Sequence, residues 1–145
     1  MALPKIIKHS FMYKRRGDIM LEELLGSQIL DVDTFDNKFS VRLKNGDIYH
    51  YEIIEDEGDC CGFNEFGILL IDNDETEKNP IITNIVSEKG DTEYDEDTLK
   101  LTFFGEHKAI AEINSLSSSG SGWCYGACVT LRCRETGKEH TLTSY

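Results

Sequence analysis

The stretch that decides the fold is residues 39–54, which reads FSVRLKNGDIYHYEII. Apolar and polar side chains alternate over residues 39–43 and again over 48–54, which is the period of a half-buried β-strand. The tripeptide NGD at 45–47 separates the two runs, and Asn and Gly tolerate the positive φ that a tight hairpin turn needs. The sequence therefore predicts two antiparallel strands joined by a turn.

The same reasoning predicts strands on both sides of this hairpin. They are expected at 28–35, 66–71, 81–86, 98–104, 108–113, 123–133 and 139–145, with a short helix as the alternative at 66–71. Polar or acidic connections are expected at 55–59, 72–80 and 87–97, and a flexible low-complexity loop at 116–122. A short helix is expected at 18–25, where Asp18 can cap its start and Gly26 can end it.

Short hairpin links favour an antiparallel sheet over a parallel, doubly wound one. We therefore expect an α+β fold, a mostly antiparallel β-sheet of about six to eight strands with one or two short helices. The length of 145 residues suits a single domain, 1–145. Within it, residues 1–26 form a basic segment with a short helix, and 27–145 form a β-rich core.

Charge is distributed unevenly along the chain. The net charge is −12, yet residues 1–16 carry Lys5, Lys8, Lys14, Arg15 and Arg16 and no acid. Residues 52–97 carry 16 acids against two lysines, a net of −14. Such an acidic segment repels nucleic acid backbones and attracts basic surfaces, so direct nucleic acid binding is disfavoured. The plainer interpretation is a solvated face that keeps the protein in solution.

Neither a membrane span nor an export signal is expected. No apolar run reaches the roughly 18 residues of a membrane-spanning helix. The N-terminus lacks the long apolar region and small-residue cleavage site of a secretory signal. We therefore expect a cytoplasmic protein that does not contact membranes, with its five cysteines reduced.

Two short motifs carry a resemblance to known proteins. They are GDCC at 58–61 and GWCYGA at 122–127. With them, the chain resembles small uncharacterised domains of bacteriophages and their hosts, which have an Asp-Cys-Cys step after a short strand and an aromatic-Tyr-Gly step that opens a later strand. The resemblance covers residues 47–133 and implies a phage or prophage origin, but it implies no activity and no catalytic residues.

The acids and the phage context together predict a binding function. Closely spaced carboxylates on a rigid sheet can imitate DNA phosphates and occupy the nucleic acid channel of another protein. The carboxylates expected to make this contact are Glu55, Asp56, Glu57, Asp59, Asp91, Glu93, Asp95, Glu96 and Asp97. We expect a non-enzymatic inhibitor of a host defence complex that targets nucleic acid, its partner being a host protein with a basic surface. A structural or assembly component is a further alternative.

A second hypothesis is a small-ligand module that binds or sequesters a nucleotide. Ser and Gly amides can cradle an anion, and aromatic rings can stack on a base. The residues concerned are Ser119, Gly120, Trp123 and Tyr125. The plainer interpretation is a hairpin tip ahead of core aromatics. The oligomeric state stays open, a homodimer included.

The cysteines give a weaker metal hypothesis. Cys60, Cys61, Cys124 and Cys128 could converge as a zinc site, but adjacent cysteines on a strand point to opposite faces, and the spacing does not match a zinc knuckle. Small buried thiols are the favoured interpretation, and no cofactor is expected. His50 or His140 could activate a thiol, but no spacing matches a cysteine hydrolase. The acidic loops lack the Gly and Glu positions of an EF-hand.

Overall fold

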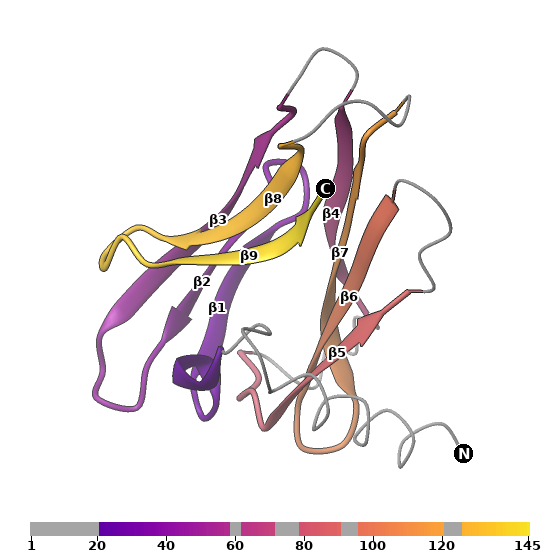
Figure 1. Ribbon diagram of the computed structural model, residues 1–145. Coiled ribbons are helices and arrows are strands. Elements are labelled where there is room, and N and C mark those ends of the chain that lie inside the picture. The colour runs from indigo at the N-terminus through magenta and orange to yellow at the C-terminus, as the bar shows by residue number, and fades with distance from the viewer. Residues whose placement is uncertain (1–20, 59–61, 72–78, 91–95, 121–125) are drawn as a thin grey trace.

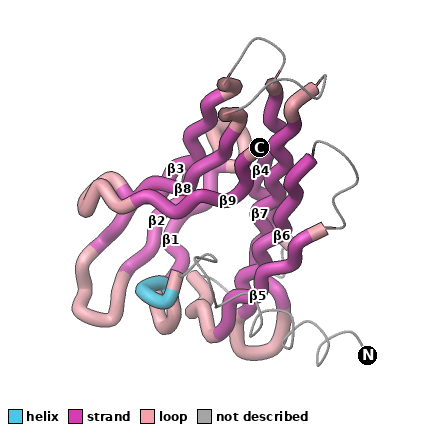
Figure 2. Tube along the Cα trace, in the orientation of Figure 1, coloured by secondary structure: helices cyan, strands magenta, loops and turns pink. Residues whose placement is uncertain are grey.

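The structure is a computed structural model that describes residues 21–58, 62–71, 79–90, 96–120 and 126–145. Its elements are a 3₁₀ turn, η1 (Glu22–Leu24), and the strands β1 (Gln28–Asp33), β2 (Lys38–Arg42), β3 (Ile48–Asp56), β4 (Phe63–Leu70), β5 (Asn84–Lys89), β6 (Glu96–Phe104), β7 (Ala109–Ser118), β8 (Cys128–Cys133) and β9 (Glu139–Ser144). Figure 2 shows the dominance of strands over helix in this part of the chain.

The strands form two sheets that face each other as a sandwich (Figure 1). Sheet A has the order β1-β2-β3-β8-β9, and sheet B has the order β4-β7-β6-β5. The pairings between these strands are antiparallel. The prediction of mostly antiparallel β-structure is confirmed, but the strands are divided between two sheets rather than joined in one.

The hairpin at residues 39–54 forms as predicted. Phe39 pairs with Tyr51 and Val41 pairs with Tyr49 across β2 and β3. At the turn, Gly46 adopts a φ of 95° and the Leu43 N–H donates to the carbonyl of Asp47 over 2.8 Å. The positive φ explains why the turn uses glycine at this position.

The helix predicted at 18–25 is reduced to the single 3₁₀ turn Glu22–Leu24, with residues 18–20 lying outside the described residues. Tertiary contacts end the turn early. The Gly26 N–H donates to the carbonyl of Ile82 over 2.7 Å, and Gly26 itself has a φ of 83°. The chain thus enters sheet A instead of continuing a helix, so the expectation of one or two short helices is only partly met.

Several predicted strands have different bounds, and the one expected at 108–113 is the longer β7. The strand expected at 81–86 begins three residues later as β5, because Ile81 makes only an isolated bridge to Gln28 and Ile82 bonds to Ser27. The strand expected at 123–133 is β8, which starts at Cys128. Residues 66–71 belong mainly to a strand, β4, and not to a helix.

The expectation of a flexible loop at 116–122 is wrong for its first part. Leu116 and the two serines that follow belong to β7, and Ser117 and Ser119 are fully buried. The Ser117 hydroxyl takes part in a hydrogen-bonded interior between the sheets, described below. A Ser-rich composition therefore marks a polar core strand here and not a linker.

The apolar core lies between the sheets away from these serines. Phe39 stacks on Tyr51 with ring centroids 5.1 Å apart, and Phe103 of sheet B approaches Phe39 at 5.9 Å. Leu101 and Ile113 of sheet B complete the contact with sheet A. In the described part of the chain, no helix has the length and apolar character that crossing a membrane requires.

Candidate functional site at the acidic end of the sandwich

Six strand ends meet at one end of the sandwich. In sheet A, Asp56 pairs with Cys128 and Cys128 with Ser144, so β3 and β9 end where β8 begins (Figure 1). In sheet B, Ser118 at the end of β7 pairs with Phe63 at the start of β4 and with Glu96 at the start of β6. We call this region the acidic end and define it by Glu55, Asp56, Glu57, Glu96 and Asp97.

The structure thus brings together five of the nine carboxylates expected to contact a partner. Glu55, Asp56 and Glu57 are exposed at the end of β3, and Glu96 and Asp97 are half-buried at the start of β6. The other four, Asp59, Asp91, Glu93 and Asp95, lie outside the described residues.

Among the described residues, two hydrogen bonds between a side chain and a backbone group join the sheets at this end. The Ser144 N–H donates to Asp97 Oδ2 over 2.9 Å, which links β9 to β6. The Asn64 side-chain amide donates to the carbonyl of Asp56 over 3.0 Å, which links β4 to β3. Together with the strand pairings, these bonds close a ring through β3, β8, β9, β6, β7 and β4. The ring fixes the positions of the backbones that carry the acids.

A chain of buried hydroxyls supports this ring from inside. Ser115 Oγ lies 2.6 Å from Thr143 Oγ1, and Thr143 Oγ1 lies 2.8 Å from Ser117 Oγ. Ser117 donates its only proton to Asn64 Oδ1 over 2.7 Å. Thr143 must then donate to Ser117, and Ser115 to Thr143. The hydrogen bonds therefore run in one direction, from the interior toward Asn64.

The acids differ in the hydrogen bonds and ion pairs that their carboxylates make. Asp97 accepts from Ser144 and pairs with Lys89 Nζ at 2.8 Å, and its side chain is only 18% exposed. It is therefore a positioning residue. Glu55 lies 3.3 Å from the Asn64 amide, and Asp56 accepts the Gly58 N–H over 2.8 Å. Within the described chain, the carboxylates of Glu57 and Glu96 make no hydrogen bond or ion pair, Glu57 being exposed and Glu96 half-buried.

The residues of the nucleotide hypothesis are not brought together in the described chain. Ser119 is fully buried, so its hydroxyl is not presented to a ligand in solution. Gly120 is exposed, and its N–H donates to Ser118 Oγ over 3.1 Å. Trp123 and Tyr125 lie outside the described residues.

The cysteine hypothesis rests mostly on residues outside the described chain, since Cys60, Cys61 and Cys124 lie there. Cys128 is half-buried beside Asp56. Among the residues that the structure describes, no group of three or more His, Cys, Asp or Glu side chains is arranged to hold a metal ion.

Each of the histidines considered as a base pairs with a carboxylate. His50 Nδ1 lies 2.5 Å from Glu135 Oε2, and His140 Nε2 lies 3.0 Å from Glu23 Oε1. Partial desolvation raises the pKa of Glu135, but hydrogen bonds from the backbone N–H and imidazole of His50 outweigh it and hold the pKa below its ordinary value. Sequence reasoning missed this pair because the two residues are 85 positions apart.

A buried phenol lies in the apolar core. Tyr51 is 1% exposed, and its hydroxyl has no hydrogen-bond partner of ordinary geometry in the described chain. Desolvation by burial raises its pKa far above the ordinary 10.0, and the nearby Cys133 and Glu23 add to the effect. Cys133, its cross-strand neighbour, is a buried free thiol and a weak hydrogen-bonding group.

No family model matches the chain, and neither a curated protein nor a solved structure matches it. The chemistry of the acidic end therefore comes from the chain's own residues. It offers exposed carboxylates on a closed ring of strands, an arrangement suited to contact with a cationic surface.

Proposed function

We propose that this protein is a non-enzymatic binding protein that docks its acidic end on a basic surface of a partner protein. The observation that carries the proposal is the convergence of exposed Glu55, Asp56 and Glu57 from sheet A with Glu96 from sheet B. The end of β3, at Asp56, and the start of β6, at Glu96, are 40 residues apart in the sequence. They nevertheless lie at the same end of the sandwich (Figure 1).

The support for these acids suits a preformed binding surface. The hydrogen bonds of Asp97 and Asn64 hold the two sheets together directly beneath the exposed carboxylates. A surface that is already ordered loses little conformational entropy on binding. Clustered charge of one sign also steers an oppositely charged partner and accelerates association.

The partner class follows from the charge and from the phage resemblance. A protein that binds nucleic acid presents a basic channel to phosphates, and a fixed row of carboxylates can enter such a channel in place of the phosphates. We therefore propose a host defence complex that targets nucleic acid as the partner, contacted in the host cytoplasm, with this chain as its inhibitor.

The test compares two variants of the full chain that lose the same charge. The first is Glu55→Gln, Glu57→Gln and Glu96→Gln, which neutralises the acidic end. The matched control is Asp36→Asn, Glu106→Gln and Glu139→Gln, which neutralises exposed acids elsewhere. Each immobilised protein is incubated with host lysate at low and high salt, and captured proteins are identified by mass spectrometry.

The expected result is a basic protein that the wild type and the control capture at low salt. The same protein should be lost from the first variant, and lost from all three at high salt, because salt screens exposed charges. Equal capture by both variants, or capture indifferent to salt, would contradict the proposal.

A further inference from the structure

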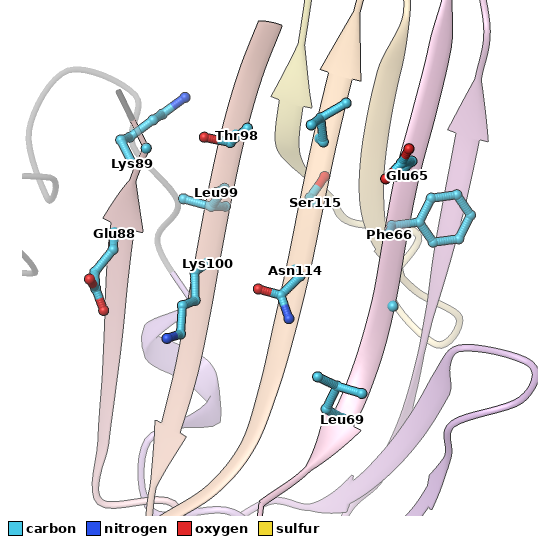
Figure 3. A pocket seen from close by; sticks show the side chains of 13 residues that line it. Glu65, Phe66, Leu69, Glu88, Lys89, Thr98, Leu99, Lys100, Asn114 and Ser115 are labelled. Carbon is cyan, nitrogen blue, oxygen red and sulfur yellow. The ribbon is translucent and has the colours of Figure 1, made fainter. Parts of the chain in front are cut away.

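The outer face of sheet B, which points away from sheet A, carries a groove of about 560 Å³. Figure 3 shows Glu88 on β5 and Glu65 on β4 at opposite margins, with Lys100 and Asn114 on the strands between them. The inward residues of the same strands, Leu101 and Ile113, belong to the core, which fixes the groove on the outer side.

Four charged residues line the groove, Glu65, Glu88, Lys89 and Lys100, and Lys89 pairs with Asp97 at 2.8 Å. The lysine at the centre of the groove, Lys100, lies 3.5 Å from Glu112 Oε2, and Asn114 donates to the other oxygen of Glu112 over 2.7 Å. Glu112 is therefore already neutralised. Glu65 and Glu88 make no ion pair or hydrogen bond with any other described side chain. A cationic occupant is the one that these two carboxylates favour.

Two residues next to the groove are buried although they point outward. Val86 and Thr102 pair across β5 and β6, two positions along from Glu88 and Lys100, and they share the outer face with them. Val86 is 1% exposed and Thr102 is 6% exposed, yet Val86 does not belong to the hydrophobic core cluster between the sheets. Sheet A packs on the opposite face, so sheet A does not account for the burial of this pair.

The described chain begins near the end of sheet B at which β6 ends. Its first residue, Leu21, belongs to the core cluster, and the Gly26 N–H bonds to Ile82, one residue before Thr83 bonds to Phe104 at the end of β6. The segment 1–16 before it carries five cations and no acid. Extended, it spans roughly 50 Å, whereas four strands are only about 15 Å wide at the spacing of a sheet.

We propose that the groove on sheet B binds the basic N-terminal segment, residues 1–16, of the same chain. Its lysines and arginines pair with Glu65 and Glu88, and its apolar side chains cover Val86. This surface is separate from the acidic end, so the inference goes beyond the proposed function. It also gives the +5 segment a partner within its own chain, which leaves the acidic end open to other proteins.

Zero-length cross-linking of the full chain tests the proposal. A carbodiimide joins a lysine amine to a carboxylate only where the two groups are in contact. Mass spectrometry of the monomer is expected to find peptides that join Lys5, Lys8 or Lys14 to Glu65 or Glu88. In the variant Glu65→Gln/Glu88→Gln these products should disappear, whereas the control Glu106→Gln/Glu139→Gln should retain them.

Reversal of the charge at the two groove glutamates gives the second measurement. Glu65→Lys/Glu88→Lys is expected to raise the amide exchange rates of Val86 and Thr102 about tenfold, the effect of losing a small network of ion pairs. Reversing the five cations of residues 1–16 to Glu in that background should restore slow exchange. Cross-links from those lysines only to the acidic end, cross-links found only in covalent dimers, or no rescue by the reversal would overturn the proposal.

Discussion

The Ser144 N–H, at the end of β9, donates to the Asp97 carboxylate of β6 over 2.9 Å. This bond and the 2.8 Å ion pair with Lys89 occupy both carboxylate oxygens of Asp97. Asp97→Ala is expected to lower the free energy of unfolding by about 1.5–3 kcal/mol, because a backbone donor loses a charged acceptor. Urea unfolding measures the change. The adjacent Glu96→Ala should change the value by less than about 0.5 kcal/mol, and equal losses would show that Asp97 has no special role.

The buried hydroxyl chain predicts a large effect of a nearly isosteric change. Thr143→Val removes the hydroxyl that joins Ser115 to Ser117 and leaves both serines short of a partner. The expected loss of unfolding free energy is about 1–3 kcal/mol, measured by urea unfolding. The control is Thr141→Val, an exposed position on the same strand. If both variants behave alike, the hydroxyl chain contributes nothing specific to stability.

Removal of the buried phenol hydroxyl is expected to change the free energy of unfolding in the opposite direction. Tyr51→Phe deletes a hydroxyl that is desolvated without a good hydrogen bond, while keeping the ring that stacks on Phe39. The free energy of unfolding is expected to stay constant or to rise by about 1 kcal/mol. Thermal unfolding measures it, with Tyr51→Leu as the variant that also loses the ring stacking. A clear loss in the Phe variant would mean that the hydroxyl has a partner of real strength.

The His50–Glu135 pair predicts a dependence on pH. The pKa of Glu135 is lower in the folded protein than its ordinary value of 4.5, so the unfolded state binds more protons near that value. The stabilising contribution is therefore present above pH 4.5 and disappears as pH falls through the folded pKa. Glu135→Gln should be less stable than wild type at neutral pH and equal to it in acid. A difference that persists in acid would contradict this assignment.

The parts of the fold with local causes could be predicted from the sequence. The hairpin around Gly46 depends on residues that are neighbours in the chain, and its alternating pattern exposes one face of β2 and buries Phe39 and Val41 on the other. The division into two sheets has no such local cause. β3 is joined to β8, and Tyr51 pairs there with Cys133, which is 82 residues further along.

The same difference between local and long-range contacts explains which parts of the candidate site could be predicted. Sequence patterns identified the acids of the acidic end, but they assigned Asp97 and Glu57 the same role in binding a partner. Asp97 instead accepts a hydrogen bond from Ser144, which is 47 residues away in the sequence and so could not be recognised as its partner. The Ser-rich stretch at 116–122 was predicted to be a loop because its partner, Thr143, stands 26 residues beyond Ser117. Polar residues that satisfy each other across a core have no signature in either segment alone.

The one-way order of the buried hydroxyls has an electrical consequence for the region above it. Every O–H bond from Ser115 through Ser117 points its positive end toward Asn64, and the Asn64 amide then points its protons toward Glu55 and Asp56. Aligned dipoles of this kind polarise one another and lower the electrostatic potential energy of nearby anions. The interior thus offsets part of the mutual repulsion among the carboxylates.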